Sequence, residues 1–451
     1  MIPVVTPEEM AAVDRSAPVP VDVLVRRAGG AVAWAARELL GGVYGRRVVV
    51  LAGKGNNGND GREAARRLRR WGVGVTVVEV AGASPSLPRA DLVIDAAYGT
   101  GFRGEYRAPD VGGAPVLAVD IPSGVDGLTG ASAEGVLPAV RTVTFAALKP
   151  GLLLSPGAAY TGDIDVADID LDTSAATTWL VEGSDVGGWL PSRPPATHKW
   201  RQAVWVVAGS PGMTGAATLV AGAALRAGAG YARVGVPGGG ADAGPIEAVG
   251  VPLPDEGFDA EVLADLDRFG ALAVGPGLGR AGATAAAVRT LVARAPVPVV
   301  VDGDGLAALA GADPALLAGR RAPTVLTPHD GEFARLAGSP PGADRLAAAR
   351  ALAARLGAVV LLKGPLTVVA EPGGRVLLAG TGDARLATAG TGDVLTGVIA
   401  AFLAAGVPAP EAAAAAAYVH GVAGNLGFPR GLVAGDLVAL LPAVLSELPE
   451  V

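Results

Sequence analysis

The sequence predicts an α/β protein built from two successive units, the first with a parallel β-sheet. Short apolar runs alternate with helical or turn segments along both halves, which is typical of strands covered on both faces. The chain has 451 residues, more than one ordinary domain holds. The alternation fades between residues 172 and 195, where Pro, Ser and Thr accumulate. We therefore expect one domain at residues 1–190 and a second at residues 191–451.

The composition of the chain excludes several kinds of site and targeting segment. Hydrophobic residues make up 51% of the chain and charged residues 18%, and there is no cysteine, which excludes disulfides and thiolate metal sites. The most apolar stretch, residues 396–421, is interrupted by Pro408, Pro410 and Glu411, so it predicts no transmembrane helix. The N-terminus lacks the basic segment of a signal peptide. The net charge is −7 and no basic stripe is present. We expect a cytoplasmic homo-oligomer with no nucleic-acid and no membrane partner.

The first unit has apolar runs that we predict as strands of its sheet. They lie at residues 46–53, 73–80, 91–96, 116–120 and 141–147. Ligands of such sheets bind beyond the carboxyl ends of the strands. Polar loops follow four of these runs: GKGNNGNDG (53–61), DAAYGTGFRGE (95–105), VDIPSGVDG (119–127) and LKPG (148–151). A site is therefore expected at this edge of the sheet.

The first of these loops joins a strand to a helix, an arrangement whose free backbone N–H groups favour anions. It lacks both the small residues of a dinucleotide-binding GxGxxG and the Walker GK[ST] sequence. Amide oxygens ligate hard cations, so Asn57 could join Asp95 and Ser123 around one. The alternative is a turn in which Asn and Gly only tolerate positive φ. Both interpretations stay open from the residues alone.

Asp120 ends a predicted strand in the loop VDIPSGVDG. The functional interpretation makes it an acid or base whose pKa is tuned by burial and by Lys149. The alternative is an Asx turn or a helix cap. Convergence of several polar strand ends favours the functional interpretation.

The second half repeats the α/β pattern from residue 203, and its sharpest motif is GTGDVLTG (390–397). Backbone N–H groups at such a helix start can hold phosphate charge while Asp393 takes a proton from an attacking hydroxyl. The alternative is Asp393 as an ordinary N-cap. Lys363 ends another strand as a natural phosphate contact, and GPGLG (275–279) permits close approach of a ligand. His329 is either a substrate contact or a cap, and His420 in an Ala-rich helix is better read as structural.

At this point the motifs resemble a known family. GNNGNDG, DAAYGTGFRGE and VDIPSG resemble the epimerase half of the bifunctional NAD(P)H-hydrate repair enzymes. HKW, AGSPGMTGAA, GPGLG, TPHDGEF, LKGPLTVV and AGTGDVLTG resemble their dehydratase half. The resemblance covers nearly the whole chain in the family's order. It implies a Rossmann-like three-layer domain followed by a ribokinase-like α/β domain.

The resemblance also implies the activity. Hydrated NADH or NADPH (NADHX or NADPHX) carries water added across C5–C6 of the nicotinamide ring, as R and S epimers at C6. The first half would interconvert the epimers. The second would remove water from the S form with ATP or ADP as phosphoryl donor. K⁺ is implied for the epimerase half and Mg²⁺ for the dehydratase half.

The site residues follow by resemblance. The metal ligands would be Asn57, Asp95 and Ser123. The hydrate contacts of the first half would be Asn56, Asn57, Gly58, Asn59, Asp60, Gly99, Thr100, Gly101, Phe102, Arg103, Gly104, Glu105 and Asp120, with Lys149 as a catalytic helper beside Asp120. The S hydrate in the second half would contact Ala216, Gly277, His329 and Asp393, the last as general base. The nucleotide contacts would be Lys363, Gly364, Pro365, Leu366, Thr367 and Gly392.

The chain departs from the family where Asn59 replaces the second glycine of the usual GNNGGDG loop. Asn tolerates left-handed geometry, so we expect the loop to keep its function. One rival is a ribokinase-like small-molecule kinase, which uses the same Gly-Thr-Gly-Asp motif. In a second rival the N-terminal half is only a nucleotide-binding or interaction module. An NAD-dependent dehydrogenase is the remotest alternative, because no GxGxxG follows an early strand.

Overall fold

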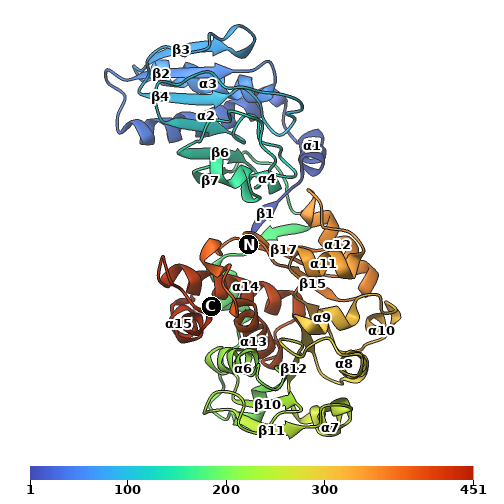
Figure 1. Ribbon diagram of the computed structural model, residues 1–451. Coiled ribbons are helices and arrows are strands. Elements are labelled where there is room, and N and C mark those ends of the chain that lie inside the picture. The colour runs from blue at the N-terminus through green and yellow to red at the C-terminus, as the bar shows by residue number, and fades with distance from the viewer. Residues whose placement is uncertain (450–451) are drawn as a thin grey trace. The chain divides into compact units, whose positions relative to one another are not determined.

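The computed structural model describes residues 1–449 and divides into two compact units (Figure 1). The N-terminal unit comprises residues 2–178, and the C-terminal unit begins at Trp179 and includes Met1. The division lies before the expected boundary at residue 190. The reason is that β8 (Thr178–Leu180) and α5 (Gly183–Trp189) belong to the second core: Val181 N donates to Leu378 O at 2.9 Å, and Val186 is fully buried there.

The N-terminal unit is built on a parallel sheet in the order β3-β2-β4-β5-β6-β7 (Figure 1). Its strands are β2 (Arg47–Ala52), β3 (Gly74–Glu79), β4 (Leu92–Ala96), β5 (Val116–Val119), β6 (Arg141–Phe145) and β7 (Asp163–Ala167). The first five confirm the predicted strands. The sequence analysis missed β7, whose residues are exposed or only partly buried at the sheet edge. A short β1 (Ile2–Val4) hydrogen-bonds to Leu148 through the backbone of Pro3.

Helices cover one face of this sheet. α2 (Val21–Leu40) and α3 (Asn56–Arg70) pack on the same side, and their buried residues share one core with alternate residues of β2, β4 and β5. α1 (Pro7–Arg15) joins this core through Met10, and α4 (Pro150–Leu153) is a single turn. The opposite face packs against Leu87, Val111 and Leu137, which lie outside helices. Both faces are covered as expected, but one layer is irregular chain.

The segment 56–60 differs from the expected loop, because α3 begins at Asn56 with Gly55 as its N-cap. The three asparagines therefore have helical backbone, and none of them has positive φ. Asn59 thus carries no backbone strain where the family usually has glycine. The helix can begin so close to the strand because Gly58 has no side chain: a Cβ there would lie 1.9 Å from the Gly53 carbonyl oxygen.

The C-terminal unit has a sheet in the order β8-β17-β16-β15-β14-β13-β12-β9-β10-β11. Strands β9 to β15 pair in parallel, while β16 runs antiparallel to both its neighbours. The strands are β9 (Ala203–Val207), β10 (Tyr231–Pro237), β11 (Val249–Leu253), β12 (Ala271–Val274), β13 (Val299–Val301), β14 (Thr324–Leu326), β15 (Val359–Leu362), β16 (Thr367–Ala370) and β17 (Val376–Ala379).

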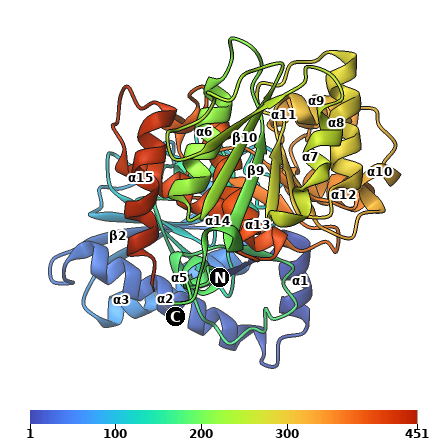
Figure 2. The same cartoon turned by 90° about the horizontal axis from the view of Figure 1, so that it is seen from below.

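Helices flank both faces of this second sheet (Figure 2). One face carries α6 (Gly215–Arg226), α13 (Thr391–Ala404), α14 (Ala409–Leu426) and α15 (Ala434–Glu447) together with α5. The remaining helices are α7 (Phe258–Ala264), α8 (Gly282–Arg294), α9 (Asp304–Leu309), α10 (Ala315–Ala318), α11 (Asp330–Ala337) and α12 (Arg345–Leu356). Within residues 1–449, no helix combines the length and the apolar character that a bilayer crossing requires.

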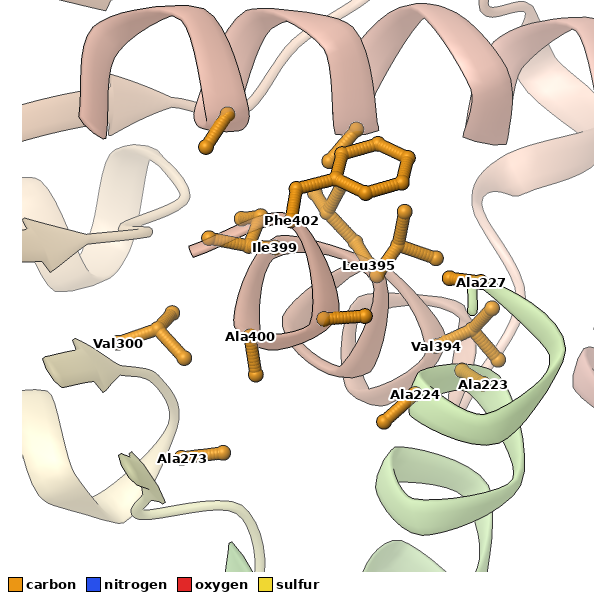
Figure 3. Packing of buried hydrophobic residues seen from close by; sticks show 14 of the residues in the cluster. Ala223, Ala224, Ala227, Ala273, Val300, Val394, Leu395, Ile399, Ala400 and Phe402 are labelled. Atoms are coloured by element: carbon orange, nitrogen blue, oxygen red, sulfur yellow. The ribbon is translucent and has the colours of Figure 1, made fainter. Parts of the chain in front are cut away.

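Small residues bring α13 and α6 close together (Figure 3). Ala223 and Ala224 of α6, and Ala227 directly after its end, face the side of α13 that carries Val394 (Figure 3). A Cβ on Gly397 would lie 2.2 Å from the Val220 carbonyl oxygen, so only glycine permits this approach. Twelve of the fourteen residues of α13 are buried, which fixes its N-terminus at the carboxyl edge of the sheet.

Candidate active sites

A cavity of about 800 Å³ lies at the carboxyl edge of the N-terminal sheet. Loops after β2, β4 and β5 form one side, and apolar residues of α2 form another. The structure brings many of the predicted hydrate contacts together there: Asn56, Asn57, Asp60, Gly99, Thr100, Gly101, Phe102, Asp120 and Lys149. Strand ends that are far apart in sequence thus converge on one space, as expected for a parallel sheet.

Five predicted contacts do not line this cavity: Gly58, Asn59, Arg103, Gly104 and Glu105. Gly58 is buried between α3 and the end of β2, where its role is to permit close packing. Asn59 is exposed, and its Oδ1 accepts a hydrogen bond from Arg62 at 3.3 Å. Arg103 is also exposed and pairs with Asp126 at 3.8 Å. Asn59 does not line the cavity because of its position around the axis of α3. Its side chain projects from the face of the helix that points away from the cavity.

Asp120 and Lys149 form a buried ion pair beside the cavity. Lys149 is 1% exposed, and its Nζ donates to Asp120 Oδ1 at 2.6 Å, Thr144 Oγ1 at 2.8 Å and Phe145 O at 3.1 Å. These three acceptors match the three protons of an ammonium group. Asp120 has a φ of 67°, which is uncommon for a residue with a side chain and concentrates at functional sites. The carboxylate is therefore held in one position.

Asp60 presents a second carboxyl group to the cavity. Its residue is 7% exposed, and no hydrogen bond or ion pair reaches the side chain from residues 1–449. Burial, together with the nearby charges of Asp120 and Asp14, raises the pKa of Asp60 to about 8. Asp60 is thus largely protonated at neutral pH while Asp120 is paired with Lys149. A carboxyl group with a raised pKa beside a second carboxyl group held by a lysine fits acid–base chemistry.

Asp14 of α1 is a cavity residue that the sequence analysis missed. Partial burial raises its pKa, Lys149 opposes that rise, and Asp120 adds to it. No local motif marks Asp14, because α1 reaches the cavity only through tertiary packing.

The three predicted metal ligands also lie near the carboxyl edge of this sheet. Asp95 is near the end of β4, Ser123 is in the loop after β5, and Asn57 is in the first turn of α3. Asp95 is 1% exposed; its carboxylate accepts from Ser123 Oγ at 2.7 Å and from Ser123 N at 2.9 Å. Burial raises the pKa of Asp95, and the hydrogen bonds from Ser123 and Ala97 oppose the rise. Both amide atoms of Asn57 are buried without a hydrogen-bond partner in the described chain. A buried amide without partners is costly, and its oxygen is available to a cation.

In the C-terminal unit, Asp393 lies in the first turn of α13. The N-cap is Gly390, with a φ of 88°, and no side chain caps this helix, so the interpretation of Asp393 as an N-cap is wrong. Burial and the charge of Asp302 raise the pKa of Asp393, and Lys363 opposes the rise; the resulting pKa is about 6. Asp393 is therefore available as a base close to neutral pH.

Asp302 is the second residue that the sequence analysis missed. It follows β13, is 3% exposed, and accepts from Lys363 Nζ at 2.6 Å and from Thr396 Oγ1 at 2.8 Å. Its position directly after an apolar, strand-like run could have identified it from the sequence. Lys363 lies against the start of α13, since a Cβ on Gly392 would be 3.2 Å from its Nζ.

His329 and His420 of this unit have different surroundings. His329 caps α11: its Nδ1 accepts from Gly331 N at 3.0 Å, and the side chain is 58% exposed. Capping, the alternative interpretation of this residue, is what the structure records, and contact with a substrate stays a prediction. His420 is buried, and burial lowers its pKa to about 4, so it is neutral. Its Nε2 lies 2.9 Å from Thr391 O, and therefore must donate, which secures the first turn of α13.

The other predicted contacts of this unit lie in two loop groups. A Cβ on Gly277 (φ 67°) would be 3.3 Å from Ala216 Cβ, so these two residues are neighbours. Residues 363–366 form the connection between β15 and β16, and Thr367 is the first residue of β16. Gly364 and Pro365 are exposed and Leu366 is buried. Lys363 N donates to Pro328 O at 2.9 Å, which joins this connection to the His329 loop.

Two family models match the chain. One, described as NAD(P)H-hydrate dehydratase, matches residues 204–442, and the other, described as YjeF-related protein N-terminus, matches residues 21–88 and 80–151. The chain is 38% identical to the bifunctional NAD(P)H-hydrate repair enzyme of Moorella thermoacetica, with 99% of this chain and 97% of the relative covered.

Solved structures resemble the C-terminal unit. The ADP/ATP-dependent NAD(P)H-hydrate dehydratase of Bacillus subtilis, co-crystallised with ATP and Mg²⁺, is 32% identical with a TM-score of 0.51, covering 59% of this chain and 98% of that chain. A ribokinase-like superfamily protein of Enterococcus faecalis is 22% identical with a TM-score of 0.51, covering 61% and 97%. The latter likeness concerns the fold alone and confirms the expected ribokinase-like architecture.

Proposed function

The chain belongs to the bifunctional NAD(P)H-hydrate repair enzymes, and from that premise we propose that its N-terminal unit epimerises the hydrates and its C-terminal unit dehydrates the S form. The observation that carries the proposal is that one chain holds two separate acid–base sites. One has Asp60 and Asp120 beside a cavity large enough for a ligand. The other has Asp393 at a helix start beside Lys363, as phosphoryl transfer requires.

Epimerisation needs C6 of the hydrated ring to lose its configuration and regain it. C6 carries a hydroxyl and is bonded to the ring nitrogen, whose lone pair can expel the hydroxyl once this is protonated. The protonated carboxyl of Asp60 would supply that proton, and water leaves. Water then returns to the planar carbon from the other face and gives a proton to Asp120. Lys149 keeps Asp120 oriented for this step.

Dehydration would begin with removal of the C6 hydroxyl proton by Asp393. The hydroxyl oxygen attacks the terminal phosphoryl group of ATP or ADP, and ADP or AMP leaves. The ring nitrogen then supplies the electrons that break the C6–O bond and release phosphate. Loss of a proton from C5 to the departing phosphate forms the C5–C6 double bond of NADH or NADPH. The charge on the phosphoryl oxygens is met by backbone N–H groups at the start of α13 and by Lys363. His329, Ala216 and Gly277 would contact the hydrate, and Lys363 to Thr367 with Gly392 the nucleotide.

Magnesium fits this site as an ion held chiefly by the nucleotide phosphates. Within residues 1–449, no group of three or more His, Asp or Glu side chains is placed to hold a metal. Mg²⁺ often binds through phosphates, water and only one or two carboxylates. It would shield phosphate charge during transfer.

Potassium fits the N-terminal unit through its oxygen donors. The Asn57 amide has no partner in the described chain, and the buried carboxyl of Asp95 has no cationic partner there. We propose that Asn57, Asp95 and Ser123 hold K⁺. The ion would offset the burial of the Asp95 charge and satisfy the orphaned amide oxygen.

Thermal unfolding tests the potassium site without relying on activity. At equal ionic strength, K⁺ should raise the melting temperature of the N-terminal unit above its value in choline chloride. The shift should be about 2–4 °C for each kcal/mol of binding free energy. Asn57→Leu should abolish the difference between the salts. Equal melting temperatures in both salts for the unmodified protein would contradict the site.

The proposed function is tested with an R/S mixture of NADH hydrate, Mg²⁺, K⁺ and either ATP or ADP. Recovery of the full reduced-nicotinamide absorbance is expected, and the nucleotide that supports it identifies the donor. Recovery of the S fraction alone, followed by the uncatalysed rate, would refute the epimerase assignment. A stable phosphorylated product without recovered absorbance would favour the small-molecule kinase.

A further inference from the structure

We propose that Asp302 is a positioning residue for the dehydratase reaction, holding the Lys363 ammonium and the first turns of α13 in the arrangement that receives the transferred phosphoryl group. This inference rests on the proposed function of the C-terminal unit. Asp302 would act through Lys363 and α13 and would not touch the hydrate.

The two carboxylate oxygens of Asp302 join two elements that are distant in sequence. Oδ1 accepts from Lys363, 61 residues away at the end of β15, and Oδ2 accepts from Thr396, 94 residues away in α13. Asp302 and Thr396 are both buried, with exposed fractions of 3% and 0%. Low dielectric strengthens such bonds and makes the loss of either one costly. The carboxylate therefore fixes the lysine relative to the helix.

Lys363 retains donors for a ligand. The only hydrogen bond of its ammonium group in the described chain goes to Asp302, so two of its three ammonium protons have no protein acceptor there. Its side chain is 22% exposed, whereas Lys149 of the other unit is 1% exposed and has three acceptors. The ammonium also lies beside Gly392, and the backbone N–H groups of Gly392 and Asp393 have no acceptor among residues 1–449. A phosphoryl group at this helix start would meet both kinds of donor.

Asp302 also influences the general base through its charge. The charged groups that act on Asp393 are Asp302 after β13 and Lys363 after β15, while His420 of α14 is neutral near pH 7. Asp302 raises the pKa of Asp393 and Lys363 opposes that rise. Removing the Asp302 charge should therefore lower the pKa of Asp393, and removing the Lys363 charge should raise it.

The experiment compares Asp302→Asn and Lys363→Met in the full-length protein. Turnover of the S hydrate is followed by reduced-nicotinamide absorbance as a function of pH. For Asp302→Asn we expect kcat to fall about 10- to 1000-fold, because oriented charge at a phosphoryl site contributes that much. The acidic limb of its kcat profile should move to lower pH. For Lys363→Met the same limb should move to higher pH.

Thr396→Val is the matched control. It removes one hydrogen bond to Asp302 but leaves all charges in place, so kcat should fall less and the acidic limb should stay where it is in the unmodified protein. An Asp302→Asn variant with the pH profile of the unmodified enzyme would overturn the proposal. If Asp302→Asn does not fold, an unshifted limb in Lys363→Met overturns it equally.

Nucleotide binding separates this inference from the proposed function. Calorimetry with Mg²⁺–ATP should show at least tenfold weaker binding to Asp302→Asn than to the unmodified protein, whatever becomes of the hydrate. Unchanged nucleotide affinity in a folded Asp302→Asn variant would refute the positioning of Lys363. Absence of S-hydrate turnover in the unmodified protein would instead refute the proposed function.

Discussion

The two lysines beside the proposed general bases differ in how many of their protons the protein uses. Lys149 gives all three to protein acceptors and is buried, so its task is to orient Asp120. Lys363 gives one to Asp302 and is partly exposed. Lysine thus orients a carboxylate in the N-terminal unit, whereas in the C-terminal unit we propose that it contacts the ligand. The number of protein acceptors around each ammonium group distinguishes the two roles.

Asp60 yields a prediction at the residue scale. Its pKa is raised from 3.8 to about 8, so the folded state loses stability as the pH rises from about 4 to about 8. Asp60→Asn removes this loss and should stabilise the N-terminal unit at pH 8 by roughly 1–3 kcal/mol, the usual scale for a buried polar group without a partner. The same change should slow R/S exchange by about 10²–10⁴-fold, as loss of a general acid does.

Chemical denaturation at pH 5 and pH 8 and chromatography of the two epimers measure these effects. The difference in unfolding free energy between variant and parent should be smaller at pH 5. Asp163→Asn is the control, because Asp163 is an exposed aspartate at the start of β7, outside the cavity lining. An Asp60→Asn enzyme with the parent rate of exchange would exclude Asp60 as the acid.

At the scale of elements, the junction of β2 and α3 forms much of the N-terminal site. The helix begins directly after Gly55, so Asn56, Asn57 and Asp60 share its first turns and face the cavity. This geometry requires close contact of the helix with the strand end. Gly58 and Gly61 permit it, since a Cβ on Gly61 would lie 2.5 Å from Ala96 Cβ.

Gly58→Ala should therefore disrupt this junction. The added Cβ would overlap the Gly53 backbone, which cannot move as a flexible side chain can. We expect a loss of about 1–3 kcal/mol in the stability of the N-terminal unit, typical of overpacking, together with weaker hydrate binding. Thermal unfolding and the KM for epimerisation report the two effects. Gly74→Ala, whose nearest contact would be 3.5 Å away, is the control, and equal behaviour of both variants would contradict the argument.

At the scale of the whole molecule, each unit has its own sheet, core and site. The core around α2 and α3 contains only N-terminal residues, and the core around α6 and α13 contains only C-terminal ones. Each proposed general base lies within one unit. The two reactions should therefore respond to mutations independently.

Asp120→Asn and Asp393→Asn test this independence. Asp120→Asn should slow R/S exchange by about 10²–10⁴-fold and leave turnover of the pure S hydrate unchanged. Asp393→Asn should abolish recovery of NADH and leave exchange of the epimers at the parent rate. Both rates are measured on each full-length variant. A variant that loses both reactions while remaining folded would show that the sites are coupled.

The sequence by itself determined the two α/β units, the strands that carry the sites, the loops at their carboxyl ends and the family. These features are local, because strand periodicity and glycine-rich loops are written in consecutive residues. Only the tertiary structure decided which loop residues face the cavity: the helical phase of α3 turns Asp60 inward and Asn59 outward. It also decided the partnerships of Asp302 with Lys363 and of His420 with Thr391, and the arrival of Asp14 at the cavity. Those contacts join segments far apart in the chain, so only packing, with no local pattern, could reveal them.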